Sequence, residues 1–408
     1  MRKPIFIDLL LIAVVVAAVT VYFIATTPAT SAGVHFPLSA AERALIASVP
    51  AEADSFALVP TAAALEGKLR ANPITRPPLE DWAANQLLPS PWMVGPADLL
   101  AWREGKQTRY FVRLDPLRAL VVRLYLAFRG DSGGTILINA PPGNGLAPDL
   151  VARIAALSDT LPSGDALIVQ LRSGRTFPPI ARPAVTSLQI TGTDLVLTSN
   201  AANESVIPAG PLQARIPRSA MLTFAFGTPP RSLSDLNRLL GKKVSGLFDG
   251  GGALAIYNVE TGKLLPRPLA VIALPADASR RAALDAFLLS VAPAENVGVR
   301  VRTGEREGQL LLSFDDSLDL YIKDTTEAAA WPSARWALRM EPHRLVPVLS
   351  QLHDDIGLRI AAPHIYQSVR DLDRWIGSLQ QAGSIEAVDT LNGQVEQLQV
   401  RIAAPANR

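Results

Sequence analysis

The chain has no cysteine among its 408 residues. This absence excludes a disulfide framework, a thiolate-ligated metal site and a lipidated cysteine. Histidine occurs only four times, and the formal net charge is +2. No basic run is interleaved with aromatic residues, so we expect no nucleic-acid partner. The hydrophobic content of 49% excludes general disorder.

The most apolar stretch of the chain runs from Ile5 to Ile24. Its apolar positions include Leu9, Val14 and Val21. At about 1.5 Å per residue, a helix of this length is about 30 Å long, which matches the hydrocarbon core of a bilayer. Arg2 and Lys3 precede it, and positive residues favour the cytoplasmic side. Most of the basic residues are arginine, and alanine and proline are abundant, which is typical of a GC-rich bacterium. We therefore predict a single transmembrane anchor in the inner membrane of a bacterium, with the N-terminus cytoplasmic and the bulk of the chain periplasmic.

A cleaved signal peptide is the alternative interpretation of this stretch, because Thr30, Ser31 and Ala32 are small enough for a peptidase site. We favour the anchor, since the apolar run is longer than the apolar region of a signal peptide, which has roughly 7–15 residues. Asp8 lies in the first turn of the predicted helix, where a carboxylate is costly. It is expected either to reach the cytoplasmic headgroups or to contact a second membrane protein.

A short apolar strand, a proline and an amphipathic helix recur along the rest of the chain. This unit occupies 55–69, 109–128, 221–240, 269–291 and 335–352. Proline suits the first turn of a helix, where its missing N–H has no partner to lose. The expected buried stripes are Leu117, Leu120, Val121 and Leu124 in one helix and Leu284, Phe287, Leu288 and Val291 in another, both at helical spacing.

A longer repeat contains these units and predicts the domains. Val49-Pro50 and Ile216-Pro217 open similar segments about 167 residues apart. Late in each copy, Ser187–Ala202 and Gln309–Ala330 are expected as corresponding hairpins. The predicted organisation is an anchor at 1–25, a stalk at 26–48, a first repeat at 49–210, a second at 211–332 and a partial third unit at 333–408. The predicted fold is α+β, with one N-terminal transmembrane helix followed by tandem related domains of antiparallel or mixed sheet that carry helices on one face.

The partial third unit is expected to hold a helix and a closing hairpin. Ile365, Val369, Leu372, Ile376 and Leu379 mark one apolar helix face. The hairpin is predicted to turn at Asn392-Gly393, a dipeptide that favours tight turns.

Ser132 lies in a GDSGG segment that resembles the nucleophile region of trypsin-like serine proteases. That chemistry requires a histidine base and a carboxylate. The only upstream histidine, His35, lies in the predicted stalk, and alternating helices do not suit a double β-barrel. We therefore favour a turn, with a hydrolase that uses Ser132 as the last of three functional hypotheses.

Two polar groupings are candidate metal sites, and both have simpler explanations. His343, His353 and His364 lie near Asp354 and Asp355, but their spacing fixes no coordination geometry. Asp315, Asp316 and Asp319 lack the EF-hand pattern, and a solvated hairpin turn is expected there. We expect no metal and no cofactor.

The Pro-rich segment 72–97 carries Trp82 and Trp92 and is a candidate contact surface. The Val-Pro and Ile-Pro openings, the strand leading into a helix and the late DLVLTSN strand together resemble a broad class of uncharacterised bacterial exported proteins. These are anchored by one N-terminal helix and carry duplicated α+β extracytoplasmic domains. The resemblance spans most of 49–402 and implies no catalytic residue.

These observations favour a non-enzymatic envelope subunit that binds or scaffolds other membrane proteins. Asp8, Trp82 and Trp92 are its candidate contacts, and the bilayer is its other partner. A periplasmic protein that binds an apolar ligand or a lipid is the alternative hypothesis.

Overall fold

The structure is a computed structural model. It describes residues 33–76, 99–105, 107–129, 136–139, 145–172, 183–203, 210–228, 247, 250–260, 267–291, 301–313, 315–354, 359, 366–367 and 382–405. The predictions for Ile5–Ile24, including Asp8, and for Trp82, Trp92, Ser132 and most of the helix at 364–381 lie outside these residues. The described elements form an α+β protein, and the chain divides into unit 1 (Met1–Ala202) and unit 2 (Asn203–Arg408).

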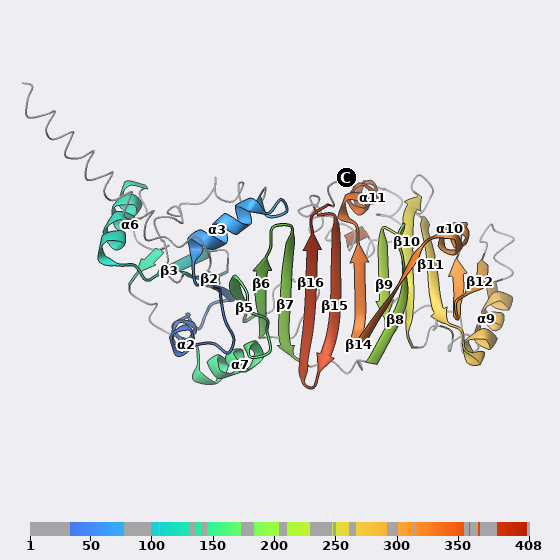
Figure 1. The fold of residues 1–408 in the computed structure, drawn as a ribbon, viewed down its shortest axis with the longest axis horizontal. Coiled ribbons are helices and arrows are strands. Elements are labelled where there is room, and N and C mark those ends of the chain that lie inside the picture. The colour runs from blue at the N-terminus through green and yellow to red at the C-terminus, as the bar shows by residue number, and fades with distance from the viewer. Residues whose placement is uncertain are drawn as a thin grey trace, which may run out of the picture. The chain divides into compact units, whose positions relative to one another are not determined.

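Unit 1 is built around a mostly antiparallel sheet (Figure 1). Its strands are β1 (Ser55–Val59), β2 (Leu99–Glu104), β3 (Gln107–Val112), β4 (Ile136–Ile138), β5 (Ala166–Gln170), β6 (Ala184–Ile190) and β7 (Asp194–Ala202). They follow the order β4-β3-β2-β1-β5-β6-β7, and only the β3–β4 pair is parallel. The first strand of the unit therefore lies in the middle of its sheet.

Helices cover both faces of this sheet. The described helices of unit 1 are α2 (Ala40–Ala47), α3 (Ala62–Ala71), α6 (Pro116–Arg129) and α7 (Pro148–Ser158). α3 and α6 pack against Tyr110, Val112 and Ala101. α7 lies on the opposite face, where Asn200 of β7 donates a 2.9 Å hydrogen bond to the Leu157 carbonyl. The prediction of helices on one face only is thus wrong for this unit, because strands such as β3 are apolar on both sides.

Residues 33–48, expected as part of a stalk, are packed into unit 1. Val34 is fully buried and forms a bridge with Gly164. The helix expected near 40–48 is present as α2, and Ser39 and Glu42 form a reciprocal capping box at its start. Leu45 and Ile46 are buried on its inner side. The segment lies within the folded unit because its apolar side chains have core positions to fill.

Unit 2 is built on strands whose described pairs are all antiparallel. Its strands are β8 (Gly210–Pro217), β9 (Leu222–Phe226), β10 (Gly252–Glu260), β11 (Arg267–Pro275), β12 (Arg302–Arg306), β13 (Gln309–Ser313), β14 (Thr326–Met340), β15 (Ser384–Asn392) and β16 (Val395–Ala403). The order is β12-β13-β11-β10-β9-β14-β15-β16. The first part of the long β14 pairs with β8 and its second part with β9 and β15. The domain boundary expected between 332 and 333 therefore falls inside β14.

The described helices of unit 2 also lie on two faces. They are α9 (Ala278–Val291), α10 (Ser317–Lys323) and α11 (Pro342–His353). Ile272 and Leu274 of β11 pack against α9, whereas Val271 and Ala273 face α10. Successive side chains of a strand point to opposite faces, so this apolar strand is buried on both sides.

The expected strand-proline-helix units are present wherever the structure describes them. All five strands are found, as β1, β3, β9, β11 and β14, and four of the helices, as α3, α6, α9 and α11. The helix expected after β9 lies outside the described residues. The hairpins β6–β7 and β15–β16 are also present. The second hairpin turns one residue later than expected, at Gly393-Gln394, where Gly393 supplies a positive φ of 63°.

Two predictions about local structure are wrong. The segment expected as a hairpin at Gln309–Ala330 contains the helix α10 between β13 and β14. In α6, the expected buried stripe points outward, because Leu117, Leu120 and Leu124 are 37%, 55% and 52% exposed. In α9, Leu284 and Phe287 are buried as expected, and Leu288 packs against the same cluster.

No helix among the described residues combines the length and the apolar character needed to cross a bilayer. The segment predicted as the anchor lies outside these residues.

Candidate functional site

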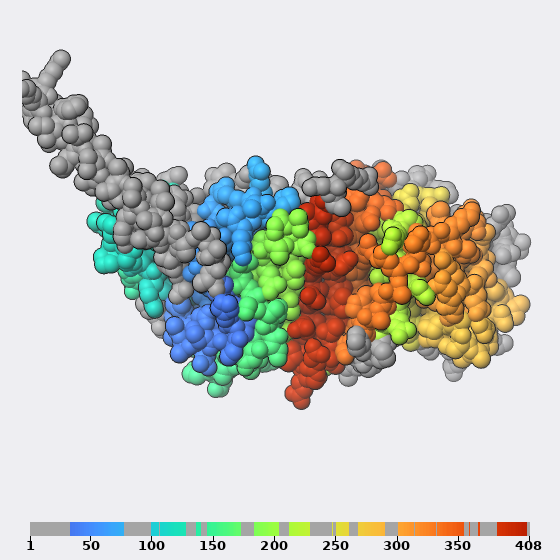
Figure 2. Space-filling model, in the orientation of Figure 1, coloured from blue at the N-terminus to red at the C-terminus, as the bar shows by residue number. Residues whose placement is uncertain are grey.

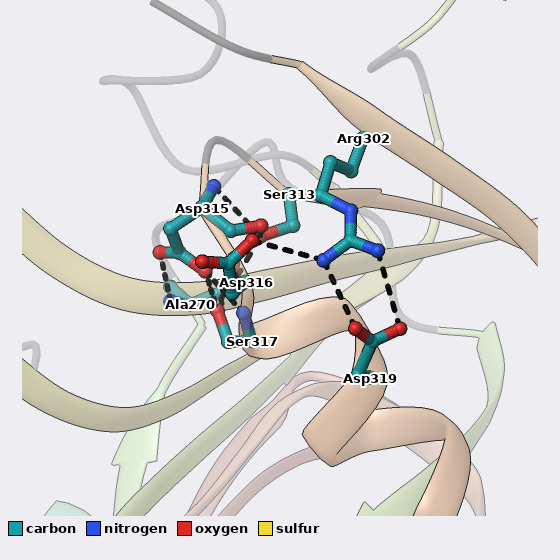
Figure 3. A network of polar contacts seen from close by, with 7 residues as sticks. All are labelled: Ala270, Arg302, Ser313, Asp315, Asp316, Ser317 and Asp319. Atoms are coloured by element: carbon teal, nitrogen blue, oxygen red, sulfur yellow. Dashed lines mark hydrogen bonds and ion pairs between the residues drawn. The ribbon is translucent and has the colours of Figure 1, made fainter.

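Figure 3 shows a polar network where β13 leads into α10. The Asp315 carboxylate accepts hydrogen bonds from the Ser317 backbone N–H at 2.6 Å, from the Ser313 hydroxyl at 2.9 Å and from the Ala270 backbone N–H at 3.2 Å. The Ser317 hydroxyl also donates to it. Asp315 is 3% exposed. Its oxygens are occupied by these donors, so this side chain fixes the start of α10.

The two other aspartates of this turn pair with an arginine from β12. Arg302 contacts Asp316 at 3.0 Å and both carboxylate oxygens of Asp319 at 3.0 and 3.3 Å (Figure 3). The hydrogen bonds and charge of Asp319 raise the pKa of Arg302 above its ordinary value. The three acidic residues considered for calcium are therefore divided between a backbone anchor and an ion pair. Among the residues that the structure describes, no group of three acidic or histidine side chains could hold a metal ion.

A hollow of about 300 Å³ adjoins this network. It is lined by Glu260, Leu269, Asp315, Asp316, Ser317, Asp319, Leu320 and Lys323. Its volume is at the lower end for small-molecule sites, which are mostly apolar. Charged side chains form much of its wall, so it does not suit an apolar ligand.

A second hollow in unit 2, of about 210 Å³, involves β8, β9, β14 and β15. Trp331, Ala337 and Val388 contribute apolar walls, and Arg339, which is 3.5 Å from Glu327, contributes a charged one. The volume is below the usual range for a ligand site. Neither described hollow supports the alternative hypothesis of an apolar-ligand binder.

The histidines singled out in the sequence are separated by the structure. His343 lies in the first turn of α11 and His353 is its last residue. His353 stacks on Tyr366, with ring centroids 6.0 Å apart. His364 and Asp355 lie outside the described residues. His35 contacts the Ser163 hydroxyl at 3.2 Å in unit 1.

A cluster of buried charges in unit 2 connects three neighbouring strands. Arg335 of β14 contacts both carboxylate oxygens of Asp389 on β15, at 2.8 and 3.0 Å, and Glu396 of β16 at 2.6 Å. Burial alone would lower the pKa of Arg335, but these two carboxylates together raise it. Burial also raises the pKa of Asp389, against the opposing effect of Arg335. The cluster joins strands in the core and has a structural role.

Unit 1 has a corresponding structural ion pair. Lys68 of α3 contacts Asp165 at 2.5 Å, and the second oxygen of Asp165 accepts from the Ile190 backbone N–H at 2.8 Å. The Asp165 side chain is 8% exposed. This pair ties α3 to the strands β5 and β6.

The feature that these internal contacts leave unexplained is the outer face of α6. Leu117, Leu120 and Leu124 lie at i, i+3 and i+7 and are all exposed. Figure 2 shows the teal atoms of α6 at the surface of unit 1. The helical spacing of these leucines predicts an apolar stripe, but the stripe faces outward and not into the core. The signal that could have shown a second face is the row Ala119, Val122 and Leu126, which is buried.

Comparisons of the chain with protein-family models, with curated proteins and with solved structures find no match.

Proposed function

We propose that the chain is a non-enzymatic, single-pass subunit of the bacterial envelope, anchored in the inner membrane by Ile5–Ile24. Its two α+β units then lie in the periplasm, where they bind or scaffold other membrane proteins. The observation that carries the membrane part of this proposal is the exposed apolar face of α6. Large exposed apolar surfaces on a folded domain mark contacts with proteins or membranes.

The polar groups of the described residues support a binding role over a catalytic one. Asp315 anchors a helix, Arg335 and Asp389 join strands, and Lys68 holds Asp165. In each case the charged atoms are used by internal partners. A catalytic base or nucleophile needs an accessible position near a substrate. The described clusters instead stabilise the fold.

Tandem duplication of the two units is part of this proposal. β1 pairs with β2 and β5, and β9 pairs in the same way with β10 and β14. β1 begins at Ser55 and β9 at Leu222, a separation of 222 − 55 = 167 residues. β15 and β16 then correspond to β6 and β7, so the strands from β14 onward complete the second copy. A duplicated scaffold offers two related binding surfaces on one chain.

Separate experiments test the membrane topology and the protein partners in this proposal. A reporter enzyme that is active only in the periplasm, fused after Arg408, should be active in the full chain and inactive without residues 2–26. Alkaline carbonate should leave the full chain in the membrane pellet. The full chain, cross-linked in its native membrane and purified in mild detergent, should carry a stoichiometric membrane protein. A reporter active only in the cytoplasm would overturn the anchor, and purification as a lone monomer would overturn the subunit role.

A further inference from the structure

The helix α6 has two apolar faces on opposite sides. At about 100° per residue, Ala119, Val122 and Leu126 fall within about 60° of one another, and these residues pack on β3 and β4. Leu117, Leu120 and Leu124 fall within a similar sector that is turned about 160° away. A helix on a protein surface normally has one apolar stripe, with polar residues opposite. The outer leucines therefore form a second contact face, which we call the leucine face.

The charges of α6 indicate the chemistry of what covers this face. From Pro116 to Arg129 the helix contains no acidic residue. Arg123 is exposed beside the leucine face, and Arg113 is exposed just before the helix. The Asp115 carboxylate at the helix start pairs with Arg118 at 3.5 Å. Leucine on one side of a helix with arginine beside it suits the headgroup region of a membrane, where anionic lipids attract the guanidinium groups.

The length of the chain between the predicted anchor and unit 1 supports the same occupant. Nine Cα–Cα steps separate Ile24 from Gly33, the first described residue, which allows at most about 30 Å. Unit 1 counts 170 residues from Gly33 to Ala202, and a domain of this size has a radius of gyration of about 15 Å. Its surface is therefore held within reach of the bilayer.

We propose that the leucine face of α6 rests in the headgroup region of the bilayer that the N-terminal segment spans. This inference rests on the proposed membrane anchor and names the partner of the α6 face. The bilayer then supports unit 1 at a second point besides the anchor. Two points of attachment restrict how the unit can rotate and fix which surface faces other envelope proteins.

The experiment places a fluorophore at single positions of the full chain. Because the protein has no cysteine, Leu120→Cys and Leu124→Cys can each be labelled alone with an environment-sensitive dye. The matched control is Leu289→Cys on α9, where the side chain is 79% exposed in unit 2. Each labelled chain is reconstituted into nanodiscs of phosphatidylethanolamine and phosphatidylglycerol, with or without brominated acyl chains.

We expect brominated lipid to quench the dye at 120 and 124 and to leave the dye at 289 unchanged. Emission at 120 and 124 should also shift to the blue relative to 289. A second variant, Leu117→Glu with Leu124→Glu, should abolish quenching at 120 while the chain remains in the nanodisc. Both positions are exposed, so this variant should still fold.

Two outcomes would overturn the proposal. One is equal quenching at 120, 124 and 289. The other is no quenching at 120 together with bismaleimide cross-links between two Leu120→Cys chains, which would assign the face to a second copy. Carbonate extraction of the same wild-type chain reports on the anchor independently. An extracted chain whose α6 is still quenched would contradict the anchor, and a retained chain without quenching would contradict only the α6 contact.

Discussion

Arg335 donates two hydrogen bonds to Asp389, at 2.8 and 3.0 Å, and each side chain is only 4% exposed. Glu396 completes the cluster at 2.6 Å from the same guanidinium group. The pair therefore joins β14 to β15 with charges that water cannot screen.

Removal of Arg335 should be strongly destabilising. Arg335→Met leaves two carboxylates partly or fully buried without their cation, and breaking a buried pair in this way costs about 3–5 kcal/mol. Urea unfolding of the full chain in detergent measures the change. Arg218→Met is the control, because Arg218 and Glu327 form an exposed pair, with side chains 60% and 49% exposed. Similar losses in the two variants would contradict the structural role of the buried cluster.

Asp315 should matter for stability far more than the neighbouring Asp316. Asp315→Ala leaves the Ser317 and Ala270 backbone donors without their acceptor, which should cost roughly 2–4 kcal/mol. Asp316 is 98% exposed on its side chain, so Asp316→Ala should change the free energy of unfolding by less than about 1 kcal/mol. Thermal unfolding of both variants makes the comparison. A larger loss of stability for Asp316→Ala than for Asp315→Ala would mean that the turn is stabilised by its surface charge and not by the buried hydrogen bonds of Asp315.

Alkaline pH should destabilise unit 2 through its buried tyrosines. Burial raises the pKa of Tyr321 to about 12, and burial reinforced by the charge of Asp324 raises that of Tyr257 as well. The folded state therefore keeps phenol protons that the unfolded chain releases near pH 10. This contribution to stability is complete below pH 10 and is lost as the pH rises from about 10 to 12.

Ultraviolet titration of tyrosinate measures this effect. Of the six tyrosines, some should ionise only near the pH of unfolding, whereas all six should ionise near pH 10 in urea. Tyr321→Phe should remove one late step and flatten the loss of stability between pH 10 and 12. Ionisation of all six near pH 10 in the folded protein would be inconsistent with the burial of these rings.

Substitution of two glycines by alanine should change the stability of the protein in opposite directions. A Cβ at Gly67 in α3 would meet no atom within 4 Å, so Gly67→Ala should stabilise the helix by up to about 1 kcal/mol. A Cβ at Gly145 would overlap the carbonyl oxygen of Ala47, a backbone atom that cannot rotate away. Gly145→Ala should therefore cost roughly 1–3 kcal/mol. If Gly145→Ala also stabilised the protein, the close approach of Gly145 to α2 would be wrong.

Local signals in the sequence predicted much of the fold. Proline at the first helical turn and apolar strands before it located β1, β3, β11 and β14 with the helices that follow. They failed at α10, where Leu318, Leu320 and Ile322 alternate like a strand. In the structure the buried residues are Leu318 and Tyr321, at helical spacing, and Leu320 and Ile322 are exposed. Asp315 starts this helix through contacts with Ala270, a residue too distant in sequence for a local pattern to reveal.

The candidate sites were less predictable, because their partners are distant in sequence. The sequence places Asp316 and Asp319 close together, but Arg302, which pairs with them, belongs to β12. The cluster of Arg335, Asp389 and Glu396 was not predicted, since it depends on the register of β14, β15 and β16. In α6 the sequence held two apolar stripes, and only the tertiary contacts decide which one is inside.

The direction of α6 can be tested with one type of substitution at two positions. Leu126 is 8% exposed in the cluster on β3 and β4, so Leu126→Ala should cost about 2–5 kcal/mol. Leu120 is 55% exposed, and Leu120→Ala should change the free energy of unfolding by no more than about 0.5 kcal/mol. Urea unfolding of each variant measures the difference.

A larger loss of stability for Leu120→Ala than for Leu126→Ala would mean that the stripe expected from the sequence is the buried one. The leucine face would then not exist. The predicted order would instead show that Leu120, a large apolar side chain of the leucine face, adds almost nothing to folding. This result is expected of a side chain whose contact lies outside the folded unit.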